Sequence, residues 1–428
     1  MKQQIYWHTT VQMPDDSNLT PIPADVDVAI IGGGYTGLSA ARTLAQHNIN
    51  VVVLEAETIG WGASSRNGGM ALTGLKAGMA TVVKKYGREL AKRLFQYSLD
   101  SVDTVEQIIK EENINCGFAR TGHLFTASKP KHYEALKDEV DFMAKEFNHK
   151  VRLVSAGELK SEIGSDIYHG ALVDEVSGGL NPAQYVAGLA AAAEKAGAIL
   201  CARARVNRLG AARSGKRFVI ETERGSLSAK SVLAATSGYT GNVTKKLQRK
   251  IIPIGSFIIA TEKLSDGLAN ELSPKNRMIF DTKHFLNYFR LWDNRMIFGG
   301  RAAFFPENEN TVSQSAEILR REMVSVYPQL DDIKVEYAWG GTLDFAFDQM
   351  THVGEVDGMF YSLGYAGHGV AMGTHLGKTV AEAMVKGNIK EHPFAQFNFP
   401  NAPLGLYDGR PWFLPFAGMW YKILDWVE

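Results

Sequence analysis

Residues 27–37 read DVAIIGGGYTG, an apolar run that ends in glycines at G-x-G-x-x-G spacing. Residues 38–45 then repeat apolar side chains at helical spacing, and a second apolar run, residues 51–54, ends in Glu55. This pattern predicts a strand, a tight turn, a helix and a second strand with an acid at its tip. The alternative is a glycine-rich turn in an ordinary α/β domain. The terminal acid favours dinucleotide binding.

Each feature of that spacing has a chemical reason. Gly32 permits the tight turn, Gly34 lets the backbone approach a pyrophosphate, and Gly37 lets the helix pack close to the strand. The N–H groups at the start of the helix attract phosphates, and Glu55 accepts hydrogen bonds from ribose hydroxyls.

Bulk composition excludes several classes of protein. A chain of 428 residues is too long for one simple core, so we expect two domains. Its 46 basic and 46 acidic residues balance, which gives no electrostatic case for nucleic acid. The two cysteines, Cys116 and Cys201, form no C-x-x-C pair. They exclude a disulfide framework and a thiolate zinc site, they fit a reducing cytoplasm, and no metal is expected.

The two ends of the chain are also informative. Residues 1–16 lack the basic and apolar regions of a signal peptide, and we expect residues 1–25 to form a loosely packed leader. No run of 18 apolar residues predicts a transmembrane helix. The aromatic tail, residues 411–421, either packs on the body of the protein or lies in a membrane interface. Its low basic charge favours packing.

The chain alternates between two kinds of structure. A strand–glycine–helix pattern returns at residues 359–384, after a β-rich stretch at residues 251–300. We therefore predict a two-domain α/β fold, a Rossmann-like dinucleotide domain built from discontinuous segments plus a β-rich substrate domain. The first comprises residues 1–115, 181–250 and 338–428, and the second comprises residues 116–180 and 251–337. The Asn181–Pro182 pair predicts the N-cap and first position of a helix that reaches about residue 196.

The glycine fingerprint alone does not separate FAD from NAD, but three features favour FAD. The fingerprint lies near the N-terminus, and a glycine-rich loop, residues 60–70, follows Glu55 where a longer cofactor would continue. The segment Gly367–His368–Gly369 also aims a second helix start at the same site, where free N–H groups stabilise the anion of a reduced flavin. No second nucleotide fingerprint appears.

Four stretches together resemble the D-amino-acid oxidase superfamily of flavoenzymes, which includes glycine oxidase and sarcosine oxidase. They are GGGYTG at 32–37, GASSRNGG at 62–69, NYFR at 287–290 and GYAGHGV at 364–370. The second and third are most similar to the γ-glutamylputrescine oxidoreductase branch. The resemblance implies that a C–H next to a neutral amine gives a hydride to flavin N5, and that the imine hydrolyses to an aldehyde or keto acid. Because neither cysteine is C-terminal, where covalent members attach flavin, we expect non-covalent FAD.

The resemblance also implies which residues bind FAD. The implied contacts are Gly32, Gly34, Tyr35, Thr36 and Gly37 at the pyrophosphate; Glu55 and Ala56 at the adenosine ribose; Val206 at the adenine, with Gly238 in the same channel; Gly62, Ala63, Ser64, Arg66, Asn67, Gly68, Gly69 and Met70 along the loop to the flavin; and Gly367, His368, Gly369 and Val370 at the pyrimidine edge of its ring.

Three residues are candidates for direct roles in the reaction, each with an alternative. Arg290 either holds a substrate carboxylate or pairs with an acid inside a sheet. Tyr288, on the same strand face, either lines the flavin pocket or packs in the core. His368 acts through its side chain or only through its backbone amide. Arg66 either contacts the cofactor or braces its loop.

One departure from the superfamily bears on the substrate. Members that oxidise amino acids often carry an arginine in a G-L-R-P-like stretch, where it binds the substrate carboxylate. Here residues 341–347 read GTLDFAF, without a cation. An α-amino acid would lose its bidentate partner, so an amine, or a substrate held elsewhere, is favoured.

We therefore expect a cytoplasmic FAD-dependent oxidoreductase of a small amine, a γ-glutamylated amine or an amino acid, with oxygen as acceptor and hydrogen peroxide as product. The first alternative is a dehydrogenase that passes electrons to a quinone or carrier. An alternative of another class is a non-catalytic flavin-binding subunit. The identity of the substrate does not follow from sequence, because the pocket depends on loop geometry.

Overall fold

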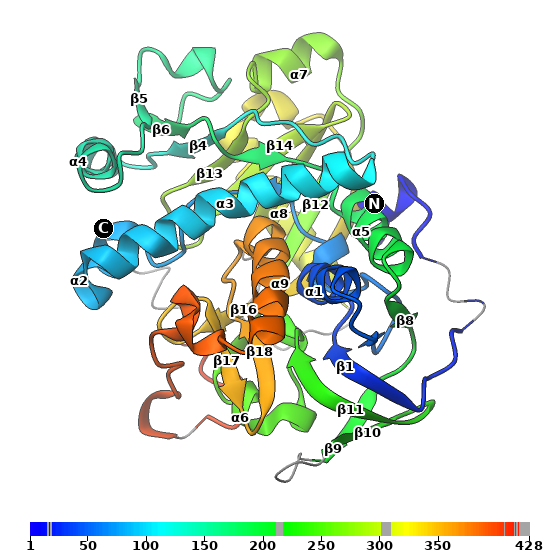
Figure 1. Ribbon diagram of the computed structural model, residues 1–428. Helices are drawn as coiled ribbons and strands as arrows, with labels where there is room; N and C mark the ends of the chain where they lie inside the picture. The colour runs from blue at the N-terminus through cyan, green and yellow to red at the C-terminus, as the bar shows by residue number, and fades with distance from the viewer. Residues whose placement is uncertain are drawn as a thin grey trace.

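A computed structural model describes residues 1–418 apart from 15, 16, 18, 211–216, 301–309, 406, 415 and 417. The described residues form two large sheets with helices between them (Figure 1). This is the two-domain α/β fold that the sequence predicts.

The first sheet is built around the glycine fingerprint. Strand β1 (Asp25–Ile31) pairs in parallel with β2 (Val51–Leu54) on one side and with β11 (Gly225–Ala234) on the other, so both neighbours end at the same edge as the turn that follows β1. The strands of this first sheet follow the order β17 (His352–Val356), β18 (Met359–Leu363), β11 (Gly225–Ala234), β1 (Asp25–Ile31), β2 (Val51–Leu54) and β8 (Ile199–Cys201). Strand β10 (Phe218–Thr222) also pairs with β11, and β9 (Val206–Gly210) pairs with β10.

Helices cover the face of this sheet that turns toward the second sheet (Figure 1). Apolar side chains of β1 and β2, including Ile30 and Val53, are fully buried against these helices. The helices are α1 (Tyr35–Gln46), α3 (Arg88–Glu112), α5 (Pro182–Lys195) and α9 (Gly369–Lys386). The side chain of Asn181 accepts from the backbone N–H groups of Ala183 and Gln184, which confirms the predicted cap of α5.

The second sheet is mainly antiparallel. It runs β16 (Val335–Ala346), β12 (Ile251–Thr261), β15 (Arg295–Gly300), β14 (Asn287–Trp292), β13 (Met278–Asp281), β4 (His123–Thr126), β6 (Gly170–Asp174) and β5 (Arg152–Ser155). A short pair, β3 (Met70–Ala71) with β7 (Gly178–Gly179), lies apart from it. The other helices are α2 (Met79–Tyr86), α4 (Pro130–Phe147), α6 (Lys245–Gln248), α7 (Asp266–Leu272) and α8 (Thr311–Val326).

The expected domain limit at residue 338 falls inside β16. That strand pairs with β12 along its whole length, from Val335 to Ala346, so its second half belongs to the second sheet. Residues 352–363 then return to the first sheet as the hairpin β17–β18. The crossing between the sheets therefore lies after residue 346.

The prediction of a loosely packed leader is wrong for Tyr6 and Trp7. Tyr6 is 4% exposed and Trp7 is 0% exposed, in a cluster with Ile258, Tyr337 and Trp339 of the second sheet. Two large aromatic side chains bury enough apolar surface to hold an irregular segment in place. Tyr6 and Trp7 are thus part of a buried aromatic cluster with the second sheet.

The described part of the aromatic tail makes contacts with the body of the protein. Phe413 packs on Phe347 and Tyr407, and Leu414 packs on a cluster that contains Phe345. Trp412 remains 61% exposed. Residues 419–421 of that tail lie outside the described residues. Along the described chain, no helix combines the length and the apolar character needed to cross a bilayer.

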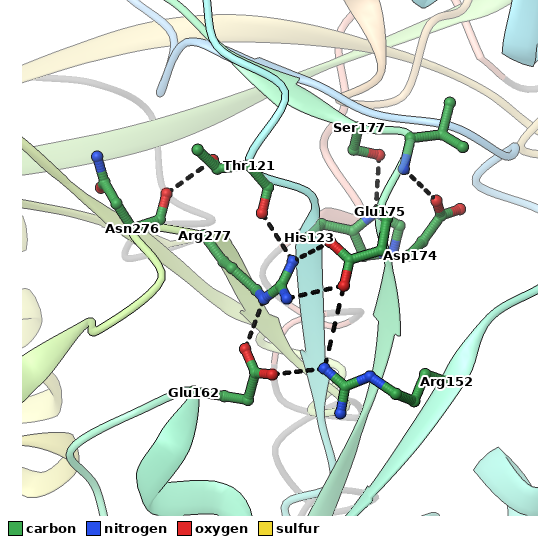
Figure 2. Close-up of polar contacts among 10 residues, drawn as sticks. Thr121, His123, Arg152, Glu162, Asp174, Glu175, Ser177, Asn276 and Arg277 are labelled. Atoms are coloured by element: carbon green, nitrogen blue, oxygen red, sulfur yellow. Dashed lines mark hydrogen bonds and ion pairs between the residues drawn. The ribbon is translucent and has the colours of Figure 1, made fainter.

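A buried ionic network joins three strands of the second sheet (Figure 2). Arg277, at the start of β13, donates to Glu162 at 2.6 Å and to Glu175 at 2.6 Å. The Arg277 and Glu162 side chains are 5% and 2% exposed, and Arg152 from β5 also pairs with Glu162. Because burial removes water from both charges, each depends on its partner.

We expect Glu162→Gln to destabilise the fold strongly, because it keeps the shape of the side chain but removes the buried anion of Arg277 and leaves it only Glu175, which is 62% exposed. The free energy of unfolding should fall by about 3 kcal/mol. Denaturant unfolding measures it. Asp166→Asn, which breaks the exposed Lys160–Asp166 pair, is the matched control and should leave the midpoint unchanged. Equal effects of the two changes would contradict a structural role for the network.

Candidate functional site

The turn between β1 and α1 accepts only glycine at its critical positions. Gly32 has φ +110°, and a Cβ on it would lie 2.5 Å from the carbonyl oxygen of Ala235. A Cβ on Gly37 would lie 1.9 Å from the carbonyl oxygen of Gly32. The helix that follows starts at Tyr35, and Gly34 before it offers no side-chain cap. The first N–H groups of α1 therefore point to the end of the sheet.

A second helix start reaches the same place. The turn that precedes α9 contains three residues with positive φ, namely Gly364, Ala366 and Gly367. The N-cap residue of α9, His368, makes no side-chain cap. Helix α9 crosses α1 so closely that a Cβ on Gly377 would lie 2.4 Å from the carbonyl oxygen of Thr36 (Figure 1).

One cavity of about 330 Å³ runs between the two helix starts. Most residues predicted to bind the cofactor line it. They are Gly32, Gly34, Tyr35, Thr36, Glu55, Ala56, Gly62, Ala63, Ser64, Asn67, Val206, Gly367, Gly369 and Val370. Glu55 accepts from the backbone N–H groups of Gly33 at 2.7 Å and Glu57 at 2.9 Å, and burial raises the pKa of its carboxyl group.

Four of the predicted residues lie outside the lining of this cavity and of its neighbour described below. Gly37 and Gly238 are packing positions, since a Cβ on Gly238 would lie 2.8 Å from the carbonyl oxygen of Leu343. Gly69 has φ +69° and faces the carbonyl oxygen of Leu180. The fourth is Arg290.

Arg290 is 3% exposed and turns toward backbone carbonyls. Its Nη1 donates to the carbonyl oxygen of Gly69 at 2.7 Å and more weakly to that of Leu180, and its guanidinium stacks on Trp292. Burial lowers its pKa to about 9. In this geometry Arg290 holds the glycine-rich loop, residues 60–70, through the carbonyl oxygen of Gly69.

A second cavity, of about 160 Å³, adjoins the first. The two share Ala63, Asn67, Leu343, Gly367 and Val370. The second is lined further by the predicted residues Arg66, Gly68, Met70, Tyr288 and His368, and by Leu72, Lys76, Ser256, Ile258, Phe280, Leu286, Gly341, Phe345 and Ala366. The hydroxyl oxygens of Tyr288 and Ser256 lie 3.0 Å apart.

His368 presents a neutral imidazole to the second cavity. Burial lowers its pKa to about 4, and the positive charge of Lys76 acts in the same direction. Its Nδ1 is buried and has no hydrogen-bond partner among the described residues. A buried nitrogen without a partner is costly, so it marks a place where a ligand or water supplies the missing bond.

The loop between the two cavities is held by indole and imidazole groups from distant segments. Trp7 Nε1 donates to the carbonyl oxygen of Asn67 at 2.9 Å, and Trp339 Nε1 donates to that of Arg66 at 2.7 Å. His8 Nε2 lies 2.9 Å from the hydroxyl of Ser65. Three consecutive residues of the loop are therefore braced from outside it.

Arg66 braces the same loop from within. Its Nε donates to the carbonyl oxygen of Trp61 at 2.7 Å, its Nη1 donates to that of Gly340, and its guanidinium stacks over the Trp61 ring. Arg66 nevertheless lines the second cavity.

Sequence reasoning missed Asp344, which lines the first cavity and is 2% exposed. Its carboxylate accepts from the N–H groups of Gly364 at 2.6 Å and Tyr365 at 3.3 Å, and its carbonyl accepts from that of Ala366. Burial raises its pKa to about 6. In the sequence, Asp344 is marked by its position in the GTLDFAF stretch, which we interpreted only through its lack of a cation. Thr236, Ser237, Arg205 and Lys76 were missed as well.

The residues that line the first cavity fit an FAD. The first cavity extends from Glu55 to two helix starts whose N-cap residues, Gly34 and His368, make no side-chain cap, which suits a ribose at one end and anionic groups beside the helices. At Gly367 a Cβ would meet no atom within 4 Å, so open space borders the second helix start. No group of three potential metal ligands occurs among the residues that the structure describes.

We expect Asp344→Ala to weaken FAD binding by about tenfold, because the turn before α9 loses the acceptor of two backbone N–H groups. Titration of the apoprotein followed by flavin fluorescence measures the dissociation constant. Asp348→Ala is the control, since Asp348 binds His352 and the N–H of Met350 and lines neither cavity. Unchanged affinity in Asp344→Ala would show that the turn holds without the carboxylate.

We expect Trp7→Phe to weaken FAD binding about fivefold, because the variant retains an aromatic ring but cannot donate to Asn67. The same titration checks it, alongside thermal unfolding. Trp412→Phe, at an exposed position, should behave like the wild type. A loss of stability with unchanged affinity would limit Trp7 to packing.

Comparison with known proteins agrees with this geometry. The family described as DAO, FAD dependent oxidoreductase, matches residues 27–383. Gamma-glutamylputrescine oxidoreductase of Escherichia coli (strain K12) is 33% identical over 93% of this chain and 92% of its own length. Probable oxidoreductase OrdL of Rhizobium meliloti (strain 1021) is 32% identical over 95% of this chain and 94% of its own.

Solved structures carry the same fold. Glycine oxidase from Geobacillus kaustophilus superposes with a TM-score of 0.71 at 21% identity, over 88% of this chain and 99% of that one. L-amino acid deaminase from Proteus vulgaris gives a TM-score of 0.70 at 14% identity, over 91% and 99%. With a family match over most of its length and full-length relatives above 30% identity, the chain belongs to the DAO family of FAD-dependent oxidoreductases.

Proposed function

We propose that this flavoprotein oxidises a small amine, a γ-glutamylated amine or an amino acid, and that oxygen reoxidises it with release of hydrogen peroxide. The observation that carries the proposal is the second cavity, which adjoins the dinucleotide cavity and shares Asn67, Gly367 and Val370 with it. A substrate there would lie beside the cofactor. The similarity to gamma-glutamylputrescine oxidoreductase supports an amine as the reacting group.

A bound FAD would supply the acceptor for a hydride from the carbon next to a neutral amine, and the imine product would hydrolyse to an aldehyde or keto acid. The chain supplies position and electrostatics. Phe280, Phe345 and Tyr288 form an aromatic wall that excludes water from the second cavity. The positive end of α9, starting at Gly369, stabilises negative charge at the shared boundary of the two cavities.

Two residues are proposed to contact the substrate. The Tyr288 hydroxyl, 3.0 Å from that of Ser256, can hydrogen-bond to the amine or to the water that hydrolyses the imine. His368 offers a neutral acceptor or donor, because its pKa lies near 4. Arg290 is proposed as a positioning residue that acts through the carbonyl of Gly69.

We also propose the division of the chain into an FAD-binding part and a substrate part, with the crossing placed after residue 346. A cytoplasmic location is proposed from the cysteines, since Cys116 and Cys201 are both free and buried. We propose that the aromatic tail packs on the body of the protein. Contact of the exposed Trp412 with a membrane surface is the less favoured alternative.

The purified protein should be yellow, should release its flavin in acid, and should bleach anaerobically with at least one member of an amine and amino-acid panel. Bleaching follows from electron transfer into the flavin, so absorbance near the flavin bands measures it directly. A folded flavoprotein that no amine bleaches would instead be a non-catalytic subunit.

An oxygen electrode separates the two catalytic alternatives with the same substrate. An oxidase consumes oxygen and forms peroxide at the rate of turnover. A dehydrogenase consumes little oxygen but reduces an artificial dye or a quinone.

A further inference from the structure

Arg290 differs from the other buried arginines of the described chain, because no carboxylate partners it. Arg42 pairs with Glu112 at 2.6 Å, and Arg277 pairs with Glu162 at 2.6 Å. Arg290 is as deeply buried, yet no carboxylate of the described residues forms an ion pair with it or raises its pKa. A buried charge without a counter-ion is costly, so it indicates a counter-charge that arrives with a bound group.

All the described contacts of the Arg290 guanidinium are with uncharged groups. Its Nη1 donates to the carbonyl oxygens of Gly69 at 2.7 Å and Leu180 at 3.3 Å and lies 3.6 Å from the sulfur of Met278. Its Nε is buried and has no partner among the described residues, and the Trp292 ring centroid lies 4.9 Å from the guanidinium carbon. Burial lowers the pKa to about 9, which leaves the side chain charged at neutral pH.

Strand β7 and the residue after it hold this guanidinium in place. A Cβ on Gly179 would lie 2.4 Å from Nη1 of Arg290, so a larger residue there would displace the guanidinium. The carbonyl oxygen of Gly69 also accepts from the N–H of Leu180 at 2.9 Å, which ties the same loop residue to the end of β7. The charge is therefore fixed before any ligand binds, which lowers the cost of using it.

One residue of the glycine-rich loop separates Arg290 from the cavities. The neighbours of Gly69 in the chain, Gly68 and Met70, line the second cavity, and Asn67 lines both cavities. Because Arg290 is 3% exposed, little water screens its charge across this thin wall, and its electrostatic effect is stronger there than in solvent. The charge therefore acts on a group bound where the two cavities meet.

The carboxylates that line the cavities do not neutralise Arg290. The described lining of the second cavity contains no carboxylate. In the first cavity, Glu55 and Glu57 lie at the expected ribose end, and the carboxylate of Asp344 accepts from backbone N–H groups in the turn before α9. An anion that pairs with the charge of Arg290 must therefore belong to a bound group.

Reduction of the cofactor would supply such an anion. The ring of an oxidised flavin is neutral, and the uptake of two electrons and one proton leaves it with one negative charge. A fixed cation nearby lowers the free energy of the charged form and leaves the neutral form almost unaffected. The helix start of α9 acts in the same direction, but it carries only about half an elementary charge, whereas Arg290 carries a whole one.

We infer that Arg290 acts across Gly69 as the counter-charge of the reduced flavin, and that its buried positive charge raises the reduction potential of the bound cofactor. Arg290 lines neither cavity, so it acts without contact with the substrate. The inference requires bound FAD but no particular substrate, and it therefore goes beyond the proposed function.

The first test separates the charge of Arg290 from its hydrogen bond. Arg290→Gln keeps an N–H donor for Gly69 but is neutral, and Arg290→Lys keeps a charged donor. In the holoenzyme, Arg290→Gln should lower the midpoint potential of the flavin by about 30 mV, which is a tenfold change in a two-electron equilibrium, and Arg290→Lys should stay close to the wild type. Reductive titration against a reference dye measures the potential. Arg88→Met, which removes an exposed arginine bound to Glu146, is the matched control and should leave the potential unchanged.

The second test leaves Arg290 in place and neutralises it. Met278 is 3% exposed, and its sulfur contacts Nη1 of Arg290. Met278→Glu puts a carboxylate beside the guanidinium in a side chain of similar size, and it should lower the potential as Arg290→Gln does. Met278→Gln, which has the same shape but no charge, is its control and should leave the potential near that of the wild type.

Sulfite gives a readout that needs neither reduction nor a substrate. Its sulfur bonds to N5 of the oxidised flavin and leaves the ring anionic, so a counter-charge should favour the adduct. The dissociation constant of sulfite should rise about tenfold in Arg290→Gln and Met278→Glu and change by less than about twofold in Arg290→Lys and Met278→Gln. Flavin content and thermal unfolding show which variants retain the fold.

The outcomes decide the role of Arg290 separately from the proposed function. A wild-type potential and sulfite affinity in Arg290→Gln would show that the hydrogen bond to Gly69 suffices, and would overturn the inference. Equal values in the two Met278 variants would overturn it as well, and this pair decides if the Arg290 variants do not retain flavin. If no amine bleaches the wild-type flavin, the proposed function fails, and these measurements still decide whether Arg290 acts as the counter-charge.

Discussion

The contact between α1 and α9 is the constraint on which the rest of the structure depends. Gly37 brings α1 against its own turn, and Gly377 brings α9 against Thr36, at separations that exclude any Cβ. Because a helix is rigid, these two contacts also set where each helix begins. Both beginnings then border one cavity, and the same packing that stabilises the domain orients two positive helix ends toward that cavity.

The glycine-rich loop between the cavities, residues 60–70, is held in place differently from helices α1 and α9. It has almost no regular structure of its own, so its shape depends on donors from elsewhere. Trp7 from the N-terminus, Trp339 from β16 and Arg290 from β14 each bind one of its carbonyl oxygens. Such single hydrogen bonds contribute about 1 kcal/mol each, but together they leave the loop one conformation. Residues from both domains thus define the surface on which the flavin is expected to lie.

What could be predicted from sequence was local. The β1–α1–β2 unit, the Asn181 cap and the strand–turn–helix at residues 359–384 each depend on residues within a few positions of one another. The family resemblance added the cofactor, and both are confirmed by the comparisons.

The features that escaped prediction depend on long-range contacts. Trp7 looked like part of a leader because its partners lie some hundreds of residues away, and β17 gave no alternating pattern that distinguishes it from a loop. Asp344 and Lys76 are ordinary charged residues until the fold places them on a cavity. Arg290 stands on the predicted strand, yet only the packed structure shows which way its guanidinium turns.

The discontinuous assembly of the first domain has a consequence for how the protein matures. Strand β18 and helix α9, at residues 359–386, complete both the sheet and the cavity that the fingerprint begins. During synthesis the N-terminal half therefore emerges from the ribosome long before the groove for the flavin is closed. Nascent chains must extend past Lys386 before loading, so a shortage of flavin in the cell would act on chains in which this domain is already synthesised and leave them exposed to proteolysis.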